Sequence, residues 1–291
     1  MDLYQPKAHS ADDFYAIGRY KDEVEWLRDE CYDSGLTTLL TEFQNEPERQ
    51  LILKLLSRVQ HFQISDRVNG IALLVKEIEK LQLDPMKTLI VATAKESESD
   101  GSKAWQYFFK FFLAQHRTWN EHSLVSSLES SYQKLNERAY ENVIIFDDFI
   151  GSGETMVKKV NEFSSNLNQR KIKVPEIHIF ALAGMEFGVR YIEDKLNRNV
   201  VCPVLVKKGI SEQELNEQQI NDEIQVMLRM ENSLKERYQS SSFIGVYSLG
   251  FKKSEALYQV QFTNCANNVF PIFWMAPRGK GRFRNTLFYR L

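Results

Sequence analysis

The segment that most constrains the fold of this chain covers residues 142–156. An apolar run at 143–146 is followed by Asp147 and Asp148 and then by a turn rich in glycine. A short, uninterrupted apolar run bounded by turn residues is typical of a strand buried in a parallel sheet. The segment therefore predicts a buried strand, a loop and the start of a helix, in that order.

The loop in this segment has the composition of a phosphate-binding cradle. Gly151 and Gly153 allow the backbone to turn its N–H groups toward one point. Ser152 and Thr155 add hydroxyl donors, and the helix that follows contributes its positive end. We therefore predict a phosphate-binding site formed by Gly151, Ser152, Gly153, Glu154 and Thr155.

Asp147 and Asp148 stand at the rim of this cradle. Successive residues at the end of a strand point in opposite directions, so the two carboxylates are expected on opposite sides. One or both could accept hydrogen bonds from sugar hydroxyls or help to hold a magnesium ion. We therefore predict that Asp147 and Asp148 are the catalytic residues and that they bind magnesium.

Strand and helix patterns alternate along most of the chain. Residues 1–85 show apolar residues at helical spacing only, and Pro85 marks the change to the first strand pattern. Such alternation implies right-handed crossovers and a parallel sheet covered on both faces. The strand patterns cover residues 88–93, 143–146, 176–183 and 200–206.

These patterns predict an α/β fold, with an N-terminal helical region at residues 1–85 and an α/β domain at residues 86–291. Within that domain, the sequence Ser-Glu-Gln-Glu at 211–214 is a capping-box signature. It predicts a long amphipathic helix that ends near Tyr238, and a last group of β-like segments is expected after that helix.

The strand, the acidic pair and the loop together resemble the ligand-binding segment of the type I phosphoribosyltransferases. In that family these parts bind the ribose 5-phosphate of phosphoribosyl pyrophosphate. The resemblance implies a type I phosphoribosyltransferase-like core in which Asp147 and Asp148 contact the ribose hydroxyls and the loop binds the phosphate. Glu154 departs from the family pattern, which has a small residue there. A carboxylate beside a bound phosphate would repel it, so either Glu154 points away or the ligand differs from the usual one.

A second polar loop, residues 95–103, follows the first strand pattern. Ligands of open parallel sheets bind outside the carboxyl ends of the strands, where both loops are expected. By its position this loop resembles the pyrophosphate loop of a phosphoribosyltransferase, which implies that Gly101, Ser102 and Lys103 face the anion. Its three acidic residues favour an ordinary solvated loop instead, and both interpretations stay open.

The end of the chain is similar to a narrower group. Residues 267–274 read Asn-Asn-x-x-Pro-Ile-x-Trp, and residues 287–290 read Leu-Phe-Tyr-Arg. These elements recur in the phosphoribosyltransferase-like proteins of prokaryotic conflict systems, among them the effector subunits of antiphage retrons. The resemblance spans residues 36–291. It implies an antiphage effector that is controlled by a reverse transcriptase with its RNA–DNA hybrid.

From Ala256 to its end the chain has no Asp or Glu. Basic residues there alternate with aromatic ones, an arrangement that can bind a phosphate backbone and stack on bases. A solvated basic loop that packs against the acidic N-terminal helices is an equally weighted alternative. The candidate nucleic-acid contacts are Arg278, Lys280, Arg282 and Arg284.

Charge and cysteine content narrow the function classes. The 37 basic residues nearly balance the 39 acidic ones, so no global attraction to nucleic acid is expected. Cys31, Cys202 and Cys265 have no metal-ligand spacing, which favours a reducing compartment and argues against a zinc site. The N-terminus is polar and no apolar run reaches membrane-spanning length, so we expect a cytoplasmic protein that does not enter a membrane.

Three functions fit these observations. The first is an enzyme that acts at the anomeric carbon of a ribose 5-phosphate or nucleotide, by ribosyl transfer or N-glycosidic cleavage, with magnesium on the diphosphate. The second is a non-catalytic nucleotide sensor, and the third is a nucleic-acid-binding regulator or effector. No general base stands out among Glu96, Glu98, Asp100 and Glu154. The substrate, the acceptor and the oligomeric state stay open.

Overall fold

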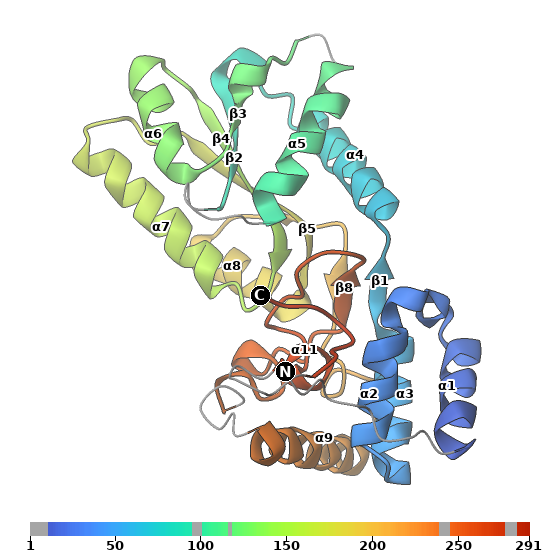
Figure 1. Cartoon of the computed structure of the whole chain (residues 1–291). Helices are drawn as coiled ribbons and strands as arrows, with labels where there is room; N and C mark the ends of the chain where they lie inside the picture. Colours follow the sequence, from blue (N-terminus) through green and yellow to red (C-terminus); the bar gives the residue numbers. More distant parts are fainter. Residues whose placement is uncertain (1–10, 95–100, 116–117, 239–244, 277–283) are drawn as a thin grey trace. The chain divides into compact units, whose positions relative to one another are not determined.

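The structure, a computed structural model, describes residues 11–94, 101–115, 118–238, 245–276 and 284–291. The chain forms two compact units, both drawn in Figure 1. The sheet unit is Phe62–Val206, and the helical unit combines Met1–His61 with Lys207–Leu291. The helical unit is therefore discontinuous in the sequence.

The sheet unit is built on a parallel sheet with the strand order β3-β2-β4-β5-β6, and β7 also pairs with β5. Every one of these pairs is parallel. β2 is buried along its whole length and β4 along its first half, as expected for strands covered on both faces. The strands are β2 Thr88–Ala92, β3 Leu124–Val125, β4 Asn142–Ile150, β5 Glu176–Met185, β6 Val200–Val201 and β7 Leu205–Val206.

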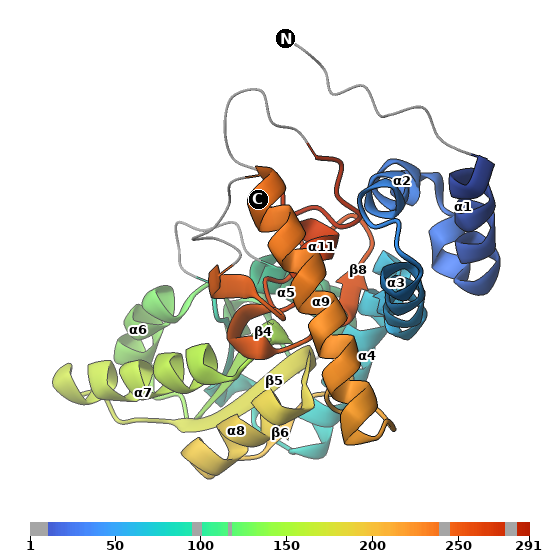
Figure 2. The same cartoon turned by 90° about the horizontal axis from the view of Figure 1, so that it is seen from below.

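Helices cover both faces of this sheet (Figure 1, Figure 2). On one face, Leu89 of β2 and Val143 of β4 share a core with Phe163 of α7. On the other face, the ring of Phe146 packs edge-on against Phe109 of α5, with centroids 5.0 Å apart. The helices are α4 Ile64–Lys80, α5 Gly101–Ala114, α6 Leu128–Glu137, α7 Glu154–Gln169 and α8 Glu186–Leu196, with 3-10 turns at Pro85–Lys87 and Glu121–Ser123. The predicted α/β fold with a parallel sheet is confirmed.

Three of the four predicted strands lie where the sequence places them. The fourth, residues 200–206, is wrong as a single strand because Pro203 separates β6 from β7. A proline has no N–H to donate to a strand ladder, so the pairing breaks there. Val200 pairs with Ile179 in the first half of β5, and Leu205 pairs with Gly184 near its end.

In the helical unit, the N-terminal helices pack with the end of the chain. Gly35 of α2 lies so close to this end that an added Cβ would be 2.4 Å from the Thr286 oxygen. Nearby, the N–H of Gln60 donates to the Leu257 oxygen at 2.9 Å, and β1 pairs with β8. The elements are α1 Ala11–Glu23, α2 Asp33–Glu42, α3 Glu46–Arg58, α9 Glu217–Tyr238, α11 Pro271–Trp274, β1 Gln60–Phe62 and β8 Tyr258–Val260, with 3-10 turns at Glu25–Arg28, Glu30–Tyr32 and Phe251–Lys253.

This division differs from the predicted boundary at residue 85. α4 lies inside the predicted helical region, yet it packs on α5 and β5 and belongs to the sheet unit. The end of the chain, predicted as part of the α/β domain, belongs with the N-terminal helices instead. The assignment of α4 and of the end of the chain to their units depends on contacts between segments distant in the sequence. Local periodicity does not predict such contacts. β8 is the only strand after Tyr238 among the described residues, so the predicted group of β segments there is wrong.

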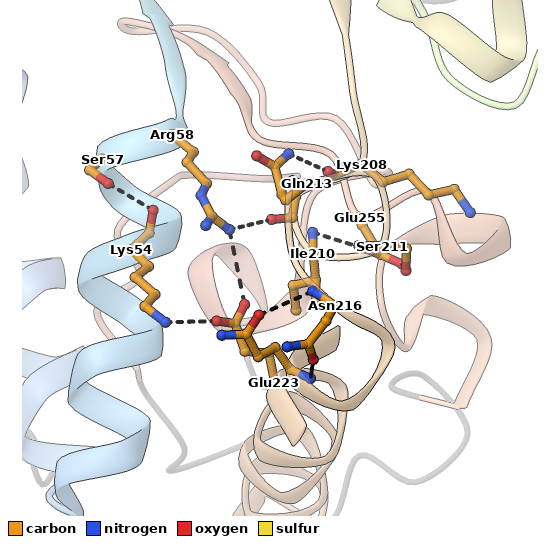
Figure 3. A network of polar contacts seen from close by, with 12 residues as sticks. Lys54, Ser57, Arg58, Lys208, Ile210, Ser211, Gln213, Asn216, Glu223 and Glu255 are labelled. Atoms are coloured by element: carbon orange, nitrogen blue, oxygen red, sulfur yellow. Dashed lines mark hydrogen bonds and ion pairs between the residues drawn. The ribbon is translucent and has the colours of Figure 1, made fainter. Parts of the chain in front are cut away.

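The long helix predicted from the signature at residues 211–214 begins later, at Glu217. The N–H and hydroxyl of Ser211 donate to the buried carboxylate of Glu255, which also accepts the Ile210 N–H at 3.0 Å (Figure 3). Ser211 is therefore not available as a helix cap, because a partner distant in sequence takes both of its donors.

The cap of α9 is a reciprocal pair three residues apart. The Gln219 N–H donates to Asn216 Oδ1 at 2.9 Å, and the Asn216 N–H donates to Gln219 Oε1 at 3.1 Å. The loop before this cap is held from α3, because Arg58 donates to the Gly209 oxygen at 2.9 Å (Figure 3). Lys54 of α3 also lies 2.8 Å from the carboxylate of Glu223 in α9.

Glu231 of α9 carries a buried carboxyl group. Burial raises the pKa of this group to about 7 from an ordinary value of 4.5, although it accepts hydrogen bonds from the Ser248 hydroxyl and the Leu249 N–H. Between these two values the folded chain holds a proton that the unfolded chain has released. The contribution of Glu231 to stability is therefore fully present below pH 4.5 and is lost as the pH rises to about 7.

We expect the free energy of unfolding to fall between pH 5 and pH 8 by about 3 kcal/mol more in the wild-type chain than in Glu231→Gln. The amide does not titrate, so the variant lacks this contribution. Urea unfolding of both chains at the two pH values measures the difference. An equal change with pH in both chains would contradict the assignment.

Candidate functional site

β4 extends through the acidic pair to Ile150, so Asp147 and Asp148 lie within the strand and not in a loop after it. Asp147 pairs with Ala181 of β5, and Phe149 pairs with Ala183. The prediction that the strand ends at residue 146 is therefore wrong, because the long neighbouring strand continues the ladder. Both aspartates are half-buried.

Asp148 lies on the face of the sheet that carries α5. A Cβ added to Gly101, the first residue of α5, would lie 2.0 Å from Asp148 Oδ2. Arg67 of α4 donates to the backbone oxygen of Asp148 at 2.9 Å, and its guanidinium lies 5.5 Å from the centroid of the Trp105 ring of α5. The side chain of Asp147 belongs on the opposite face, because successive residues of a strand alternate.

The glycine loop after β4 is packed against the start of α8. Gly153 has φ +80°, and a Cβ there would lie 2.4 Å from the Gly188 oxygen. A Cβ at Gly188 would lie only 1.9 Å from the Gly151 oxygen. Backbone therefore touches backbone on both sides, and only glycine allows this approach.

The loop leads directly into α7, as the sequence predicts. Gly153 is the N-terminal cap of this helix of 16 residues. Glu154 and Thr155 occupy its first turn and are exposed, whereas Ser152 is half-buried. An acidic residue in the first turn is favourable for the helix dipole, which accounts for Glu154 without a ligand.

The second predicted loop is described only from Gly101 onward, so Glu96, Glu98 and Asp100 lie outside the described residues. Ser102 is buried, and its hydroxyl accepts the Ala94 N–H at 3.1 Å, which gives it a structural partner. Lys103 is half-buried. The contact between Gly101 and Asp148 brings this loop to the same edge of the sheet as the acidic pair.

Four residues of this edge escape the sequence analysis: Arg67, Thr93, Lys159 and Gly188. Thr93 follows β2 and is 2% exposed, and its hydroxyl has no hydrogen-bond partner within the described part of the chain. Lys159 of α7 donates to the Thr93 oxygen at 2.7 Å. An isolated glycine in a helical pattern, as at Gly188, is a sequence signal for close packing. The other three carry no such signal.

The donor set bears on the predicted magnesium ion. No group of three or more His, Cys, Asp or Glu side chains is gathered for a metal anywhere in the described ranges. Successive side chains of β4 alternate, so the carboxylates of Asp147 and Asp148 approach the edge of the sheet from different faces. One carboxylate can serve together with phosphate oxygens and water, which is how magnesium is commonly bound beside a phosphorylated ligand.

The predicted nucleic-acid contact at Arg284 is wrong. Its side chain is 1% exposed, and Arg284 Nε lies 2.8 Å from the buried carboxylate of Glu42. Its other nitrogens donate to the Met275 oxygen at 2.9 Å and the Ile272 oxygen at 2.7 Å. The guanidinium group of Arg284 therefore has its ion-pair and hydrogen-bond partners inside the helical unit. The other three candidates, Arg278, Lys280 and Arg282, lie outside the described residues.

Residues 267–274 and 287–290, whose patterns resemble conflict-system proteins, make contacts inside the helical unit. Asn268 donates to the Ser254 hydroxyl at 2.7 Å, and Trp274 Nε1 donates to the Val269 oxygen at 2.7 Å. The guanidinium of Arg290 lies 5.4 Å from the centroid of the Trp274 ring. These residues therefore stabilise the helical unit. In the part of the chain that is described, no helix has the length and apolar character to cross a membrane.

Comparison with known proteins identifies the family. None of the curated proteins matches the chain. Among solved structures, a cobalamin-binding protein from Desulfitobacterium hafniense DCB-2 is similar at 11% identity, covering 76% of this chain and 99% of that one, with a TM-score of 0.27 at which no common fold follows. The model of the PRTase-CE family matches residues 26–290, which include both units. The chain therefore belongs to the PRTase-CE family and has a phosphoribosyltransferase-like fold.

Proposed function

We propose that the chain binds a ribose 5-phosphate compound or a nucleotide at the carboxyl end of β4 and acts at its anomeric carbon, by ribosyl transfer or N-glycosidic cleavage. One observation carries this proposal. The acidic pair, the glycine loop and the start of α5 lie together at one edge of the parallel sheet. This edge is where open α/β sheets bind their ligands.

In this proposal the loop Gly151–Gly153, directly before α7, binds the phosphate. The first N–H groups of α7 and the positive end of its dipole favour an anion at Gly151–Gly153. The hydroxyls of Ser152 and Thr155 add donors. Glu154 is exposed, so water and salt screen its repulsion of the phosphate.

The acidic pair binds the sugar. Asp147 and Asp148 accept hydrogen bonds from the ribose hydroxyls, and their charge stabilises the positive charge that develops on the ribose when the bond at the anomeric carbon breaks. Gly101 and Lys103 at the start of α5 face the diphosphate, and the buried Ser102 supports this turn through its bond to the Ala94 N–H. A magnesium ion, held by one of the two carboxylates and the diphosphate, would neutralise negative charge there.

The biological role that we propose is that of an antiphage effector held in check by a reverse transcriptase with its RNA–DNA hybrid. The similarity of residues 267–274 and 287–290 to effectors of conflict systems supports it. The alternative is a nucleotide sensor or a nucleic-acid-binding regulator that keeps the fold without the chemistry. A chain that binds a nucleotide but releases neither pyrophosphate nor a free base would favour that alternative.

The double variant Asp147→Asn, Asp148→Asn tests the site. The wild-type chain, at ten times the Kd of a ribose 5-phosphate compound with magnesium, should gain roughly 1.4 kcal/mol of stability by mass action. The double variant should gain none, because an amide carries no negative charge and is a weaker acceptor for the ribose hydroxyls than a carboxylate. Its fold without ligand should stay intact. Thermal-shift titrations with phosphoribosyl pyrophosphate, ribose 5-phosphate and nucleotides measure the gain.

Glu176→Gln is the matched control, because it removes one exposed carboxylate of the same unit at the amino end of β5, the opposite edge of the sheet. This variant should respond to the ligand as the wild-type chain does. A double variant that still gains the full stabilisation would refute a role for the acidic pair.

A further inference from the structure

The outer face of α5 has an unusual composition for an exposed helix. Residues 101–120 contain no Asp or Glu, whereas they contain Lys103, Lys110 and Arg117. Arg117 lies outside the described residues. The same stretch contains the aromatic residues Trp105, Tyr107, Phe108, Phe109, Phe111, Phe112 and Trp119. A surface helix normally presents charged and polar residues to water, so this face calls for an explanation.

The helix buries only part of this aromatic set. Trp105, Phe109 and Leu113 recur every fourth residue and are buried. Tyr107 is 70% exposed and Phe111 66% exposed, and they lie one turn apart on the outer side. Two neighbouring rings that are this exposed form an apolar patch, and such patches mark interaction sites.

A lysine lies beside the Tyr107 ring. Lys110 Nζ lies 5.8 Å from the centroid of the Tyr107 ring, and Lys110 directly precedes Phe111. A pocket of about 220 Å³ on the other side of Lys110 is lined by Glu121 as well as by Trp119, so a polyanion is not expected to enter it.

We propose that Tyr107, Lys110 and Phe111 form a platform for single-stranded nucleic acid. Exposed rings with a cation beside them match bases and phosphates, and stacking on such rings is tolerant of sequence. α5 itself carries Lys103 and Lys110 and no Asp or Glu, so this helix does not repel a phosphate backbone. Lysine is depleted in the cores of protein–protein interfaces, so Lys110 beside the exposed rings favours a polyanion over a protein partner. This inference goes beyond the proposed ribosyl chemistry.

The test uses the full chain and fluorescence anisotropy with a labelled 20-nucleotide oligo-dT and an RNA strand of mixed sequence. The wild-type chain should bind both, and Tyr107→Ala, Phe111→Ala should weaken binding about tenfold or more because two stacking surfaces are lost. Lys110→Gln should reduce the slope of log K against log salt by about 0.7, as expected for one lost phosphate contact to a single strand.

Two controls separate this platform from other surfaces and from the proposed active site. Phe262→Ala removes a ring that is 75% exposed in the helical unit and should leave binding unchanged. Asp147→Asn, Asp148→Asn should also leave it unchanged, so failure of one proposal does not imply failure of the other. Melting curves should show every variant folded, because none of the altered side chains is buried in a core.

Three results would overturn the proposal. One is the absence of binding by the wild-type chain in low salt. Another is binding that Tyr107→Ala, Phe111→Ala leaves unaltered. The third is sedimentation that shows self-association of the wild-type chain, abolished in this variant, because a second copy would then cover the face.

Discussion

Arg284→Ala should lower the free energy of unfolding by about 3–5 kcal/mol, the cost of removing one partner of a buried ion pair. The guanidinium is the buried partner of the Glu42 carboxylate, at 2.8 Å, and donates to two backbone oxygens of the helical unit. Its loss leaves the buried carboxylate with the hydroxyl of the half-buried Tyr238, at 2.5 Å, and with the more exposed Arg237. Urea unfolding of the variant measures the loss.

Arg237→Ala provides a matched control, since Arg237 contacts the same carboxylate. Its Nη1 lies 3.5 Å from Glu42 Oε1, but its side chain is 42% exposed. An exposed ion pair contributes about 0–1 kcal/mol, so this variant should differ little from the wild-type chain. Similar losses in the two variants would contradict the account of Arg284 as a buried anchor.

Gly188→Ala should destabilise the sheet unit by about 1–3 kcal/mol and abolish ligand binding at the glycine loop. The added Cβ would lie 1.9 Å from the Gly151 oxygen, so the loop must shift. A loss of stability would be informative, because replacing glycine by alanine inside a helix otherwise stabilises the fold by about 1 kcal/mol. Unfolding and ligand titration of one preparation measure both effects.

Gly18→Ala is the control for helix propensity. Gly18 lies in α1, and nothing stands within 4 Å of a Cβ added there. This variant should gain about 0.5–1 kcal/mol and keep the ligand response. A stable, ligand-binding Gly188→Ala chain would show that the close packing of the loop on α8 is not required.

The sequence predicts those parts of the fold whose signals are local. β2, β4 and β5 are recognisable because each is an apolar run bounded by turn or helix patterns. The loop of Gly151–Gly153 is likewise found from its own residues, since the glycines and the helix that follows are contiguous. For the same reason the sequence alone indicates the carboxyl end of β4 as the candidate site.

The parts that escape prediction depend on partners far away in the chain. Arg284 looks like an exposed basic residue in a stretch without acids, but its partner Glu42 lies 242 positions earlier. Ser211 has the local signature of a helix cap, yet Glu255 takes its donors. Arg67 of α4 donates to the backbone oxygen of Asp148 in β4, and no periodicity or spacing in the sequence predicts such a contact.

Calorimetric titration of the wild-type chain with phosphoribosyl pyrophosphate in the presence of magnesium tests the central claim most directly. Ribose and inorganic phosphate, titrated separately, show whether sugar and phosphate must be joined. We expect saturable binding at one site, which Asp147→Asn, Asp148→Asn abolishes and Glu176→Gln preserves. If phosphoribosyl pyrophosphate, ribose 5-phosphate and nucleotides all give neither heat nor a shift in Tm, the carboxyl end of β4 is not a ribose-phosphate site.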